Sequence, residues 1–580
     1  MKQTFIPGKD AALESSIAKM QQKLLTLGFD IEEASWLNPV PYVWSVHIRD
    51  KDCPLCFTNG KGASKKAALA SALGEYFERL SCNYFFADFY LGEKYASSSF
   101  VHYPDEQWFA VSENQLPDQL MDQRMKDFYD AEGELRAEHL IDCNSGNKER
   151  GICALRYQRQ SDGKDVFVPV AVIGNLYVSN GMSAGNTVTE ARVQSLSEIF
   201  ERAIKNRIIS EAISLPEIPL EVLQRYPTIM ESIETLEKEG FKIYCFDASL
   251  GGQFPVISVV LLNRDNGTAY ASFGGHPRFE VALERTVTEL LQGRSLKDLD
   301  VFTPPTFDTE SVAEHHNLET HFIDSSGLLS WDLFKATPDY EFVDWNFAGT
   351  TEEEYQHLMA IFNALDKEVY ISDYEHLGVY ACRIIVPDFS EIYPPEELVW
   401  NNNNSGNNIR EVLLQLPGKG SDNDFLNQIM SDLDALDIDE SASVAEFIGI
   451  APENGNPWQT LRFAELRALI ALALGDLESA LDGILWTLDF AESTFPQERI
   501  KFYRALSNLL EVAIKEPVLI KEYQQAFENM YGEQAVSEAL LHLNGEKHFA
   551  GLNSSSLELE NFPLHQKLLS AYEKLQRAKR

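Results

Sequence analysis

The sequence contains one short pattern twice, L-x-E-x-F-E-R, at residues 73–79 and 196–202. The copies are 123 residues apart, the difference between 196 and 73, and Gly62 and Gly185 keep the same offset upstream. In both copies apolar residues recur every three or four positions, which predicts an amphipathic helix with its acids on the polar face. We therefore expect an internal duplication of a glycine-led helix.

Each copy brings carboxylates and a guanidinium together. Ser71, Glu75, Glu78 and Arg79 lie three or four residues apart, which makes their side chains neighbours on a helix. A third helix is expected over residues 282–292, and it carries Arg285 four residues before Glu289. A single E-x-x-E-R is usually a solvated face with an internal ion pair. The repetition of the same acids, phenylalanine and arginine favours a shared functional site instead.

Clustered carboxylates need cations, because like charges at short range raise one another's pKa or recruit counter-ions. Oxygen ligands without histidine or cysteine favour Mg²⁺, whose remaining positions take water and substrate phosphates. The pattern therefore predicts Mg²⁺ and a nucleotide triphosphate, ATP. Planar guanidinium groups suit phosphate oxygens, so Arg202 and Arg285 are expected there, and Arg79 either acts likewise or braces Glu75. The predicted metal ligands are Glu75, Glu78, Glu198, Glu201 and Glu289.

Other nucleotide and metal motifs do not fit. Residues 60–62 and 418–421 lack the upstream glycine of a Walker loop, and no kinase signature set is present. Cys53 and Cys56 form a lone C-x-x-C. Without a second pair it is not a zinc site, so two core cysteines are the commoner interpretation and redox chemistry the alternative.

These motifs resemble the ATP site of the YcaO family, which uses S-x-x-x-E-x-x-E-R, a second acidic helix and an R-x-x-x-E element. Residues 71–79, 198–202 and 285–289 match them in turn, and the resemblance covers about residues 1 to 390. It implies a YcaO-type ATP-binding body in which the glutamates hold Mg²⁺ between the phosphates. It also adds Lys9, Ser16 and Asn186 to the nucleotide contacts.

The resemblance also implies a function. The family uses ATP to activate a backbone amide oxygen for attack by a nucleophile, so phosphoryl or adenylyl transfer to a protein or peptide substrate is expected. The resemblance looks particularly close to stand-alone bacterial members that carry a helical, tetratricopeptide-like tail. Those members are named as accessory factors for methylthiolation of a ribosomal-protein aspartate, which implies a methylthiotransferase and its ribosomal-protein substrate as partners.

Two alternatives stay open at this point. Azoline-forming relatives end in a proline-rich tail, whereas residues 575–580 contain no proline, which leaves cyclodehydratase activity and any catalytic residue unassigned. The first alternative to an amide-activating enzyme is a non-catalytic, nucleotide-regulated scaffold that recruits partners through its tail. The second alternative is an ATP-dependent amide ligase, which would act on a free carboxylate.

The length of 580 residues exceeds what one hydrophobic core serves. Strand, turn and helix alternate to about residue 390, which predicts an α/β or α+β body. An asparagine-rich run at 401–408 precedes a helix-rich tail, in which residues 474–481 resemble a tetratricopeptide unit or an ordinary helical hairpin. We predict a body over 1–395, a transition over 396–450, and an all-α, tetratricopeptide-like domain over 451–580 whose removal spares nucleotide binding. Strands are expected at 43–48, 166–174, 242–247, 256–262, 269–273, 369–373 and 379–387.

The charge balance excludes some partners. Lys and Arg total 49 against 89 Asp and Glu, a net charge of −40, which repels phosphate backbones and anionic lipids. Direct nucleic-acid or membrane binding is therefore not expected. No secretory signal or long apolar run is visible, and seven cysteines, an odd number, fit a reducing compartment. We expect a cytoplasmic protein and leave a homodimer open.

Overall fold

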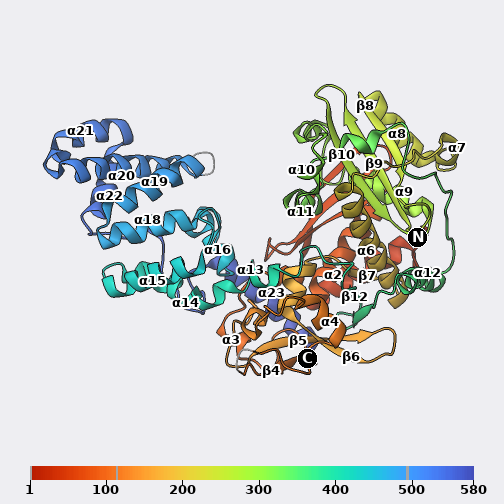
Figure 1. Cartoon of the computed structure of the whole chain (residues 1–580), viewed down its shortest axis with the longest axis horizontal. Helices are drawn as coiled ribbons and strands as arrows, with labels where there is room; N and C mark the ends of the chain where they lie inside the picture. The colour runs from red at the N-terminus through yellow and green to blue at the C-terminus, as the bar shows by residue number, and fades with distance from the viewer. Residues whose placement is uncertain (1–2, 113–114, 401, 492–494) are drawn as a thin grey trace.

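A computed structural model describes residues 3–112, 115–400, 402–491 and 495–580. Every strand within these ranges lies in a mixed body, and a group of helices extends from that body to one side (Figure 1). The last helix of the chain returns to the body, where Lys579 contacts Asn83 and His102 (Figure 1). Within the described ranges, no helix is long and apolar enough to cross a membrane.

The strands of the body form three sheets, ordered β1-β2-β3, β10-β9-β8 and β4-β5-β11-β12-β7, with β6 paired to β5. Every paired ladder is antiparallel. The body is therefore α+β among the two classes that the sequence allowed. The strands are β1 Ile31–Val40, β2 Val43–Asp50, β3 Phe57–Gly62, β4 Gln107–Phe109, β5 Ile152–Arg159, β6 Asp165–Pro169, β7 Met182–Gly185, β8 Phe241–Asp247, β9 Val256–Asn263, β10 Thr268–Gly275, β11 Tyr370–Tyr374 and β12 Tyr380–Ile385.

Both copies of the repeated pattern are helices that follow a short strand. Strand β3 leads into α2, whose N-cap Ser64 accepts a hydrogen bond from the amide of Ala67 at 3.2 Å. Strand β7 leads into α6, whose N-cap Thr187 accepts one from the amide of Glu190 at 3.1 Å. Hydroxyl caps of this kind fix where a helix begins. The main helices of the body are α1 Leu13–Leu27, α2 Lys65–Ser81, α6 Val188–Ser210, α8 Pro227–Lys238, α9 Phe279–Leu290, α11 His315–Ile323 and α12 Thr351–Ala364.

The two helices divide their pattern between core and cavity in the same way. The repeated phenylalanines, Phe77 and Phe200, are fully buried, each in a different hydrophobic core of the body. The repeated acids lie on the opposite faces and line a cavity. The helical period explains both facts, because each phenylalanine lies one or two positions from the acids, and residues at that spacing point to different sides of a helix.

The predicted strands are confirmed to within a few residues, with one exception. The strand expected over 166–174 ends at Pro169, and residues 170–177 form helical turns. The prediction was wrong for this second half. Proline lacks the backbone N–H that would continue a ladder, and Asn175 donates to the carbonyl of Ala171 at 2.6 Å, which satisfies the new turn.

The described residues after 400 form helices and no strand. Leu413, Leu426, Leu469 and Leu506 belong to a single hydrophobic core. Helices from the segment predicted as a transition therefore pack with those predicted as the tail domain. The main helices are α14 Arg410–Gln415, α15 Asn423–Leu436, α16 Val444–Phe447, α18 Phe463–Leu474, α19 Leu477–Ala491, α20 Gln497–Lys515, α21 Ile520–Tyr531, α22 Glu533–Leu543 and α23 Pro563–Lys579.

Helix α23 packs in the body (Figure 1), away from the hydrophobic core that the other tail helices share. Its residues Leu568, Tyr572 and Leu575 are fully buried in the core that also contains α1 and α2. Tyr572 donates a hydrogen bond to the carbonyl of Val101. The end of the chain thus supports the back of the helix that carries the first acidic motif.

Candidate functional site

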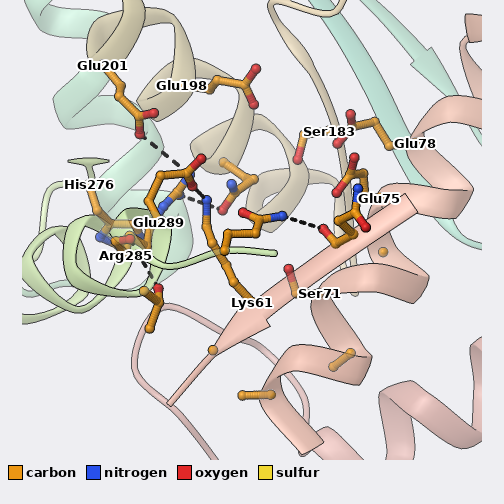
Figure 2. Close-up of a pocket in the computed structure, with 18 of the residues that line it drawn as sticks. Lys61, Ser71, Glu75, Glu78, Ser183, Glu198, Glu201, His276, Arg285 and Glu289 are labelled. Atoms are coloured by element: carbon orange, nitrogen blue, oxygen red, sulfur yellow. Dashed lines mark hydrogen bonds and ion pairs between the residues drawn. The ribbon is translucent and has the colours of Figure 1, made fainter. Parts of the chain in front are cut away.

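A cavity of about 850 Å³ lies in the body between α1, α2, α6 and α9. The sequence pointed to twelve site residues, and all of them line this cavity. Figure 2 labels several of them, including Ser71, Glu198 and Arg285. The fold thus brings together residues that are up to 280 positions apart, the difference between 289 and 9. They are Lys9, Ser16, Ser71, Glu75, Glu78, Arg79, Asn186, Glu198, Glu201, Arg202, Arg285 and Glu289.

Helices α2 and α6 present the same ion pair to the cavity. Arg79 lies 2.9 Å from the carboxylate of Glu75, and Arg202 lies 3.0 Å from that of Glu198. Each pair joins residues four apart on one helix. The brace between Arg79 and Glu75, one of the two roles expected for Arg79, is therefore present. Its counterpart on α6 has the same spacing, but Arg79 donates through Nε and a terminal nitrogen, whereas Arg202 donates through Nε.

Two side chains in the cavity have no hydrogen-bond partner among the described residues. The carboxylate of Glu78 makes no hydrogen bond or ion pair with any described residue, and its burial together with the nearby Glu198 raises the pKa of this carboxyl well above the ordinary value. The hydroxyl of Ser183 on β7 is buried and also unpaired among the described residues. Figure 2 places both beside Glu75. Unpaired oxygens cost free energy in a folded protein, which is the condition expected where a cation or ligand completes the site.

Helix α9 supplies the third wall. Arg285 donates to the side-chain oxygen of Gln194 at 2.9 Å and lies 3.9 Å from Glu201. Glu289 pairs with Lys61 on β3. Burial lowers the pKa of Lys61 to about 8, although the negative charge of Glu201 acts to raise it. Lys61 is therefore a further charged residue among the carboxylates, which the sequence considered only as part of a rejected phosphate loop.

Glu190 holds the end of the cavity nearest the N-terminus. It accepts hydrogen bonds from the amide of Asp10 at 2.8 Å and from Asn186 at 2.9 Å, and lies 3.4 Å from Lys9. Ser16 in turn donates to Asn186 at 2.7 Å. The three residues that only the family resemblance suggested are thus linked through one buried carboxylate.

Glu190 itself was not among the predicted residues, although the sequence carried a signal for it. Glu190, Gln194, Glu198, Glu201 and Lys205 recur every three or four positions and all line the cavity from α6. A search for one polar face along the whole helix would have found them. A comparison of the two copies could not identify Glu190, because the residue that aligns with it at the offset of 123 is Ala67.

The residues of the cavity fit Mg²⁺ and a nucleotide. Five carboxylates from three helices offer oxygen ligands, and four of them are each paired with an arginine or with Lys61. Mg²⁺ uses a few carboxylates and leaves its other positions to water and phosphates. The N-terminal end of the cavity also has an apolar lining suited to a flat base, formed by Ile6, Pro7, Ala11, Met20 and Val281.

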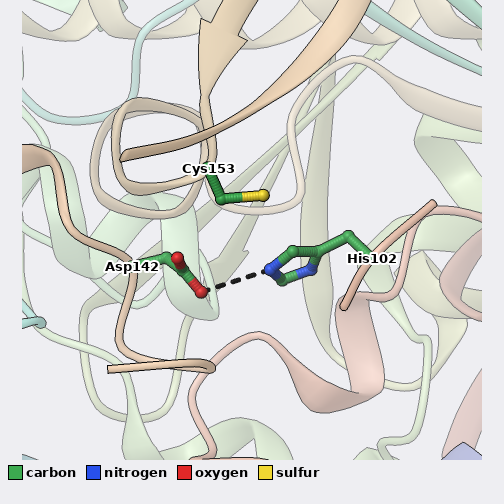
Figure 3. Close-up of side chains that lie close together, drawn as sticks. All are labelled: His102, Asp142 and Cys153. Atoms are coloured by element: carbon green, nitrogen blue, oxygen red, sulfur yellow. Dashed lines mark hydrogen bonds and ion pairs between the residues drawn. The ribbon is translucent and has the colours of Figure 1, made fainter. Parts of the chain in front are cut away.

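A different cluster lies outside the cavity (Figure 3). His102, Asp142 and Cys153 are buried, and their ligand atoms all lie within 4.8 Å of one another. The imidazole of His102 lies 3.2 Å from Asp142, which also accepts two hydrogen bonds from Ser145. These contacts satisfy the carboxylate and join two loops of the body. Burial raises the pKa of the Cys153 thiol well above its usual value.

Comparison with known sequences decides the family. A sequence profile described as "YcaO cyclodehydratase", ATP- and Mg²⁺-binding, matches residues 59–390, and a profile of the YcaO cyclodehydratase C-terminal domain matches residues 406–580. The chain belongs to the YcaO family. The first profile contains the three acidic elements of the cavity, and the second spans the tail helices, so the two YcaO profiles together account for most of the chain.

Full-length relatives agree with this assignment. The YcaO chain is 64% identical over 581 aligned positions to the Escherichia coli (strain K12) protein named "Ribosomal protein S12 methylthiotransferase accessory factor YcaO", covering 100% of this chain and 99% of that protein. It is 61% identical to an uncharacterized protein of Haemophilus influenzae, with the same coverage. A YcaO structure from Methanopyrus kandleri bound with AMPPCP and Mg²⁺ matches with a TM-score of 0.42 at 16% identity, covering 67% of this chain and 95% of that one.

Proposed function

We propose that this YcaO protein binds Mg²⁺ and ATP in the cavity and transfers a phosphoryl or adenylyl group to a backbone amide oxygen of a protein or peptide. We further propose that this step supports methylthiolation of ribosomal protein S12, as the name of the 64% identical E. coli relative indicates for that protein. The observation that carries the proposal is the convergence of three acidic helices, with their arginines, on one cavity.

The residues of the chain have separate tasks in such a transfer. The amide oxygen forms a bond to phosphorus as the bond to the bridging oxygen breaks, and ADP or pyrophosphate leaves with the electron pair. Arg202 and Arg285 neutralise charge on the phosphate oxygens. Bound Mg²⁺ would supply further charge neutralisation there. Glu75 and Glu198 keep the arginines of their own helices in place.

An isotope experiment tests this reaction. Purified S12 with ¹⁸O in its backbone amides is incubated with the protein, Mg²⁺ and ATP, and released phosphate and AMP are analysed by mass spectrometry. Label in phosphate or AMP supports amide activation, because a nucleophile that attacks the activated amide carbon breaks its bond to the labelled oxygen, which leaves with phosphorus. Label retained in S12 while a side-chain carboxylate becomes an amide supports the ligase reading. ATP binding without turnover supports the nucleotide-regulated scaffold.

We propose an internal duplication for the two strand–helix units. Each has a glycine at the end of a short strand, a hydroxyl N-cap and a helix with the pattern E-x-x-E-R. The ion pairs on α2 and α6 support this origin, because a shared ancestor would place a glutamate and an arginine at the same helical spacing in both helices. The two helices would then have diverged at positions such as Ala67 and Glu190.

We propose a tetratricopeptide-like, protein-binding role for the tail helices. Helices α18 and α19 form a hairpin around Gly475, and Gly483 lets them approach closely because a Cβ there would lie 2.8 Å from that of Ala468. A methylthiotransferase and S12 are the proposed partners, with a second copy of the chain as an alternative. A cytoplasmic location follows from this role, since ribosomal proteins are modified there.

A further inference from the structure

Helix α6 runs along the whole cavity and divides it into three parts. Its cavity-lining residues extend from Glu190 to Asn206, and the 15-residue separation between Glu190 and Lys205 spans about 22 Å. Glu190 lies at the end with the apolar lining and the Lys9 contacts. Glu198 and Glu201 lie in the middle among the carboxylates. Lys205 lies beyond them, in a part of the cavity that neither the acidic motifs nor the resemblance assigned.

The far part has its own walls. Lys205 and Asn206 come from α6, Phe322 from α11, and Asp324 and Ser325 from the segment that follows α11. The guanidinium of Arg202 lies 4.6 Å from the ring of Phe322, so the far part adjoins the carboxylate cluster directly. Ile323, which also lines the cavity, is 69% exposed, which places this end at the protein surface.

Lys205 is held in a fixed position at this end. Its amine donates to the carbonyl of His321 at 2.5 Å and to the hydroxyl of Ser325 at 2.7 Å. A lysine nitrogen has a third position after two hydrogen bonds, either another N–H or a lone pair. Burial and the neighbouring Arg202 lower the pKa of Lys205 to about 7, while Glu201 and Asp324 oppose the shift. Both forms of the amine are therefore accessible near neutral pH.

The in-line geometry of phosphoryl transfer indicates where the attacking group would lie in the cavity. The attacking oxygen must approach phosphorus from the side opposite the leaving group. If the base occupies the apolar end and the phosphates lie among the carboxylates, the attacking group must lie beyond the carboxylates, next to Lys205. We propose that the Lys205 end is the acceptor subsite, where a peptide amide lies between Lys205 and Phe322. This inference rests on the proposed function.

Nucleotide protection tests the placement without a known substrate. The full chain is pulse-acetylated with and without AMPPCP and Mg²⁺, and lysine labelling is read by mass spectrometry. We expect Lys9 and Lys61 to become protected while Lys205 keeps its reactivity. Equal protection of Lys205 would make it a nucleotide contact and overturn the subsite. No protection at any of the three lysines would contradict the proposed nucleotide site itself, a distinct failure.

Point variants give a second readout. We expect Lys205→Met to keep AMPPCP affinity within about twofold, and to lower S12-dependent phosphate release roughly a hundredfold, because the acceptor loses its positioning contact. Lys205→Arg should keep part of the rate that Lys205→Met loses, because arginine retains a hydrogen-bond donor at this position. Arg207→Met, an exposed position on the same helix that pairs with Glu211, is the control and should change neither quantity. A tenfold loss of AMPPCP affinity in Lys205→Met would overturn the inference.

Discussion

The two repeated glycines, Gly62 and Gly185, lack a Cβ atom, and this absence allows each strand to pack closely against the helix that follows it. A Cβ at Gly185 would lie 2.6 Å from the amide nitrogen of Ala191, and one at Gly62 would lie 2.7 Å from the Cβ of Ala67. Neither site has the space for alanine without movement of backbone or neighbour. The glycine that the sequence marked only as a repeated position therefore sets how closely each acidic helix packs on its strand.

We expect Gly185→Ala to destabilise the protein by about 1–3 kcal/mol, because overpacking forces the strand from the helix. Gly74→Ala is the matched variant. Gly74 lies inside α2, and a Cβ added there would meet no atom within 4 Å, so alanine should raise the free energy of unfolding by up to about 1 kcal/mol. Urea denaturation of the two variants would measure both changes. A neutral Gly185→Ala would show that the close approach is not required.

Glu78 is the residue at which metal binding should be most visible. Its carboxylate has no partner among the described residues, unlike that of Glu75, which Arg79 holds at 2.9 Å. We expect Glu78→Gln to weaken AMPPCP binding in the presence of Mg²⁺ at least about tenfold, and to have little effect after chelation. Isothermal titration calorimetry with and without EDTA would measure this, with Glu211→Gln at the exposed end of α6 as control. Equal losses under both conditions would exclude a metal-ligand role.

At the scale of single elements, α23 is attached by a histidine that must stay neutral. His565 accepts a hydrogen bond from the amide of Ala451 at 3.1 Å, and its other ring nitrogen lies 2.8 Å from the carbonyl of Tyr90. One ring nitrogen accepts and the other donates, so protonation would break the first bond. Burial lowers the pKa of His565 to about 4, which keeps the ring neutral in the folded protein at neutral pH.

The pH dependence of stability should report this attachment. Because the folded-state pKa lies below the ordinary value of about 6.5, the contribution of His565 is present above that value and is lost as the pH falls toward 4. We expect the Tm of the protein to fall more between about pH 7 and pH 5 than that of His565→Gln, since glutamine has a donor and an acceptor but does not titrate. Parallel curves for the two proteins would refute this role.

For the whole molecule, the return of α23 changes the expectation that the tail can be removed. A truncation at about residue 450 would also remove Leu568, Tyr572 and Leu575 from the core behind α2. Lys579 also attaches α23 to the body. Its buried amine donates hydrogen bonds to Asn83, which lies just after α2, and to the carbonyl of His102. We now expect such a truncation to lose nucleotide binding, because α2 carries Glu75 and Glu78.

A pair of tyrosine variants separates this effect from general loss of the tail. Tyr572→Ala should destabilise the protein by about 3–5 kcal/mol, as for other large aromatic side chains in cores, and should lower AMPPCP affinity. Tyr523→Ala on α21, where the side chain is 46% exposed, should change neither quantity. Thermal unfolding and calorimetry would measure both. Wild-type affinity in Tyr572→Ala at a temperature where it is folded would show that α23 does not position α2.

Sequence alone determined the local features of this protein. The helical period places Glu75, Glu78 and Arg79 on one face and Phe77 on the other, and this follows from residue spacing without any knowledge of the fold. The same reasoning located most strands and the change to helices after residue 400. It failed over 170–174, where the apolar run continues but a proline ends the ladder.

Only the tertiary structure decided which distant elements meet. The joining of Lys61 to Glu289, of Lys9 to Glu190, and of α23 to the back of α2 depends on how separate apolar faces pack together. Such contacts are absent from local sequence patterns, because their partners are separated by hundreds of residues and are chosen by shape and burial over the whole chain. The cavity exists because three helices, each predictable alone, pack with their acidic faces toward one another.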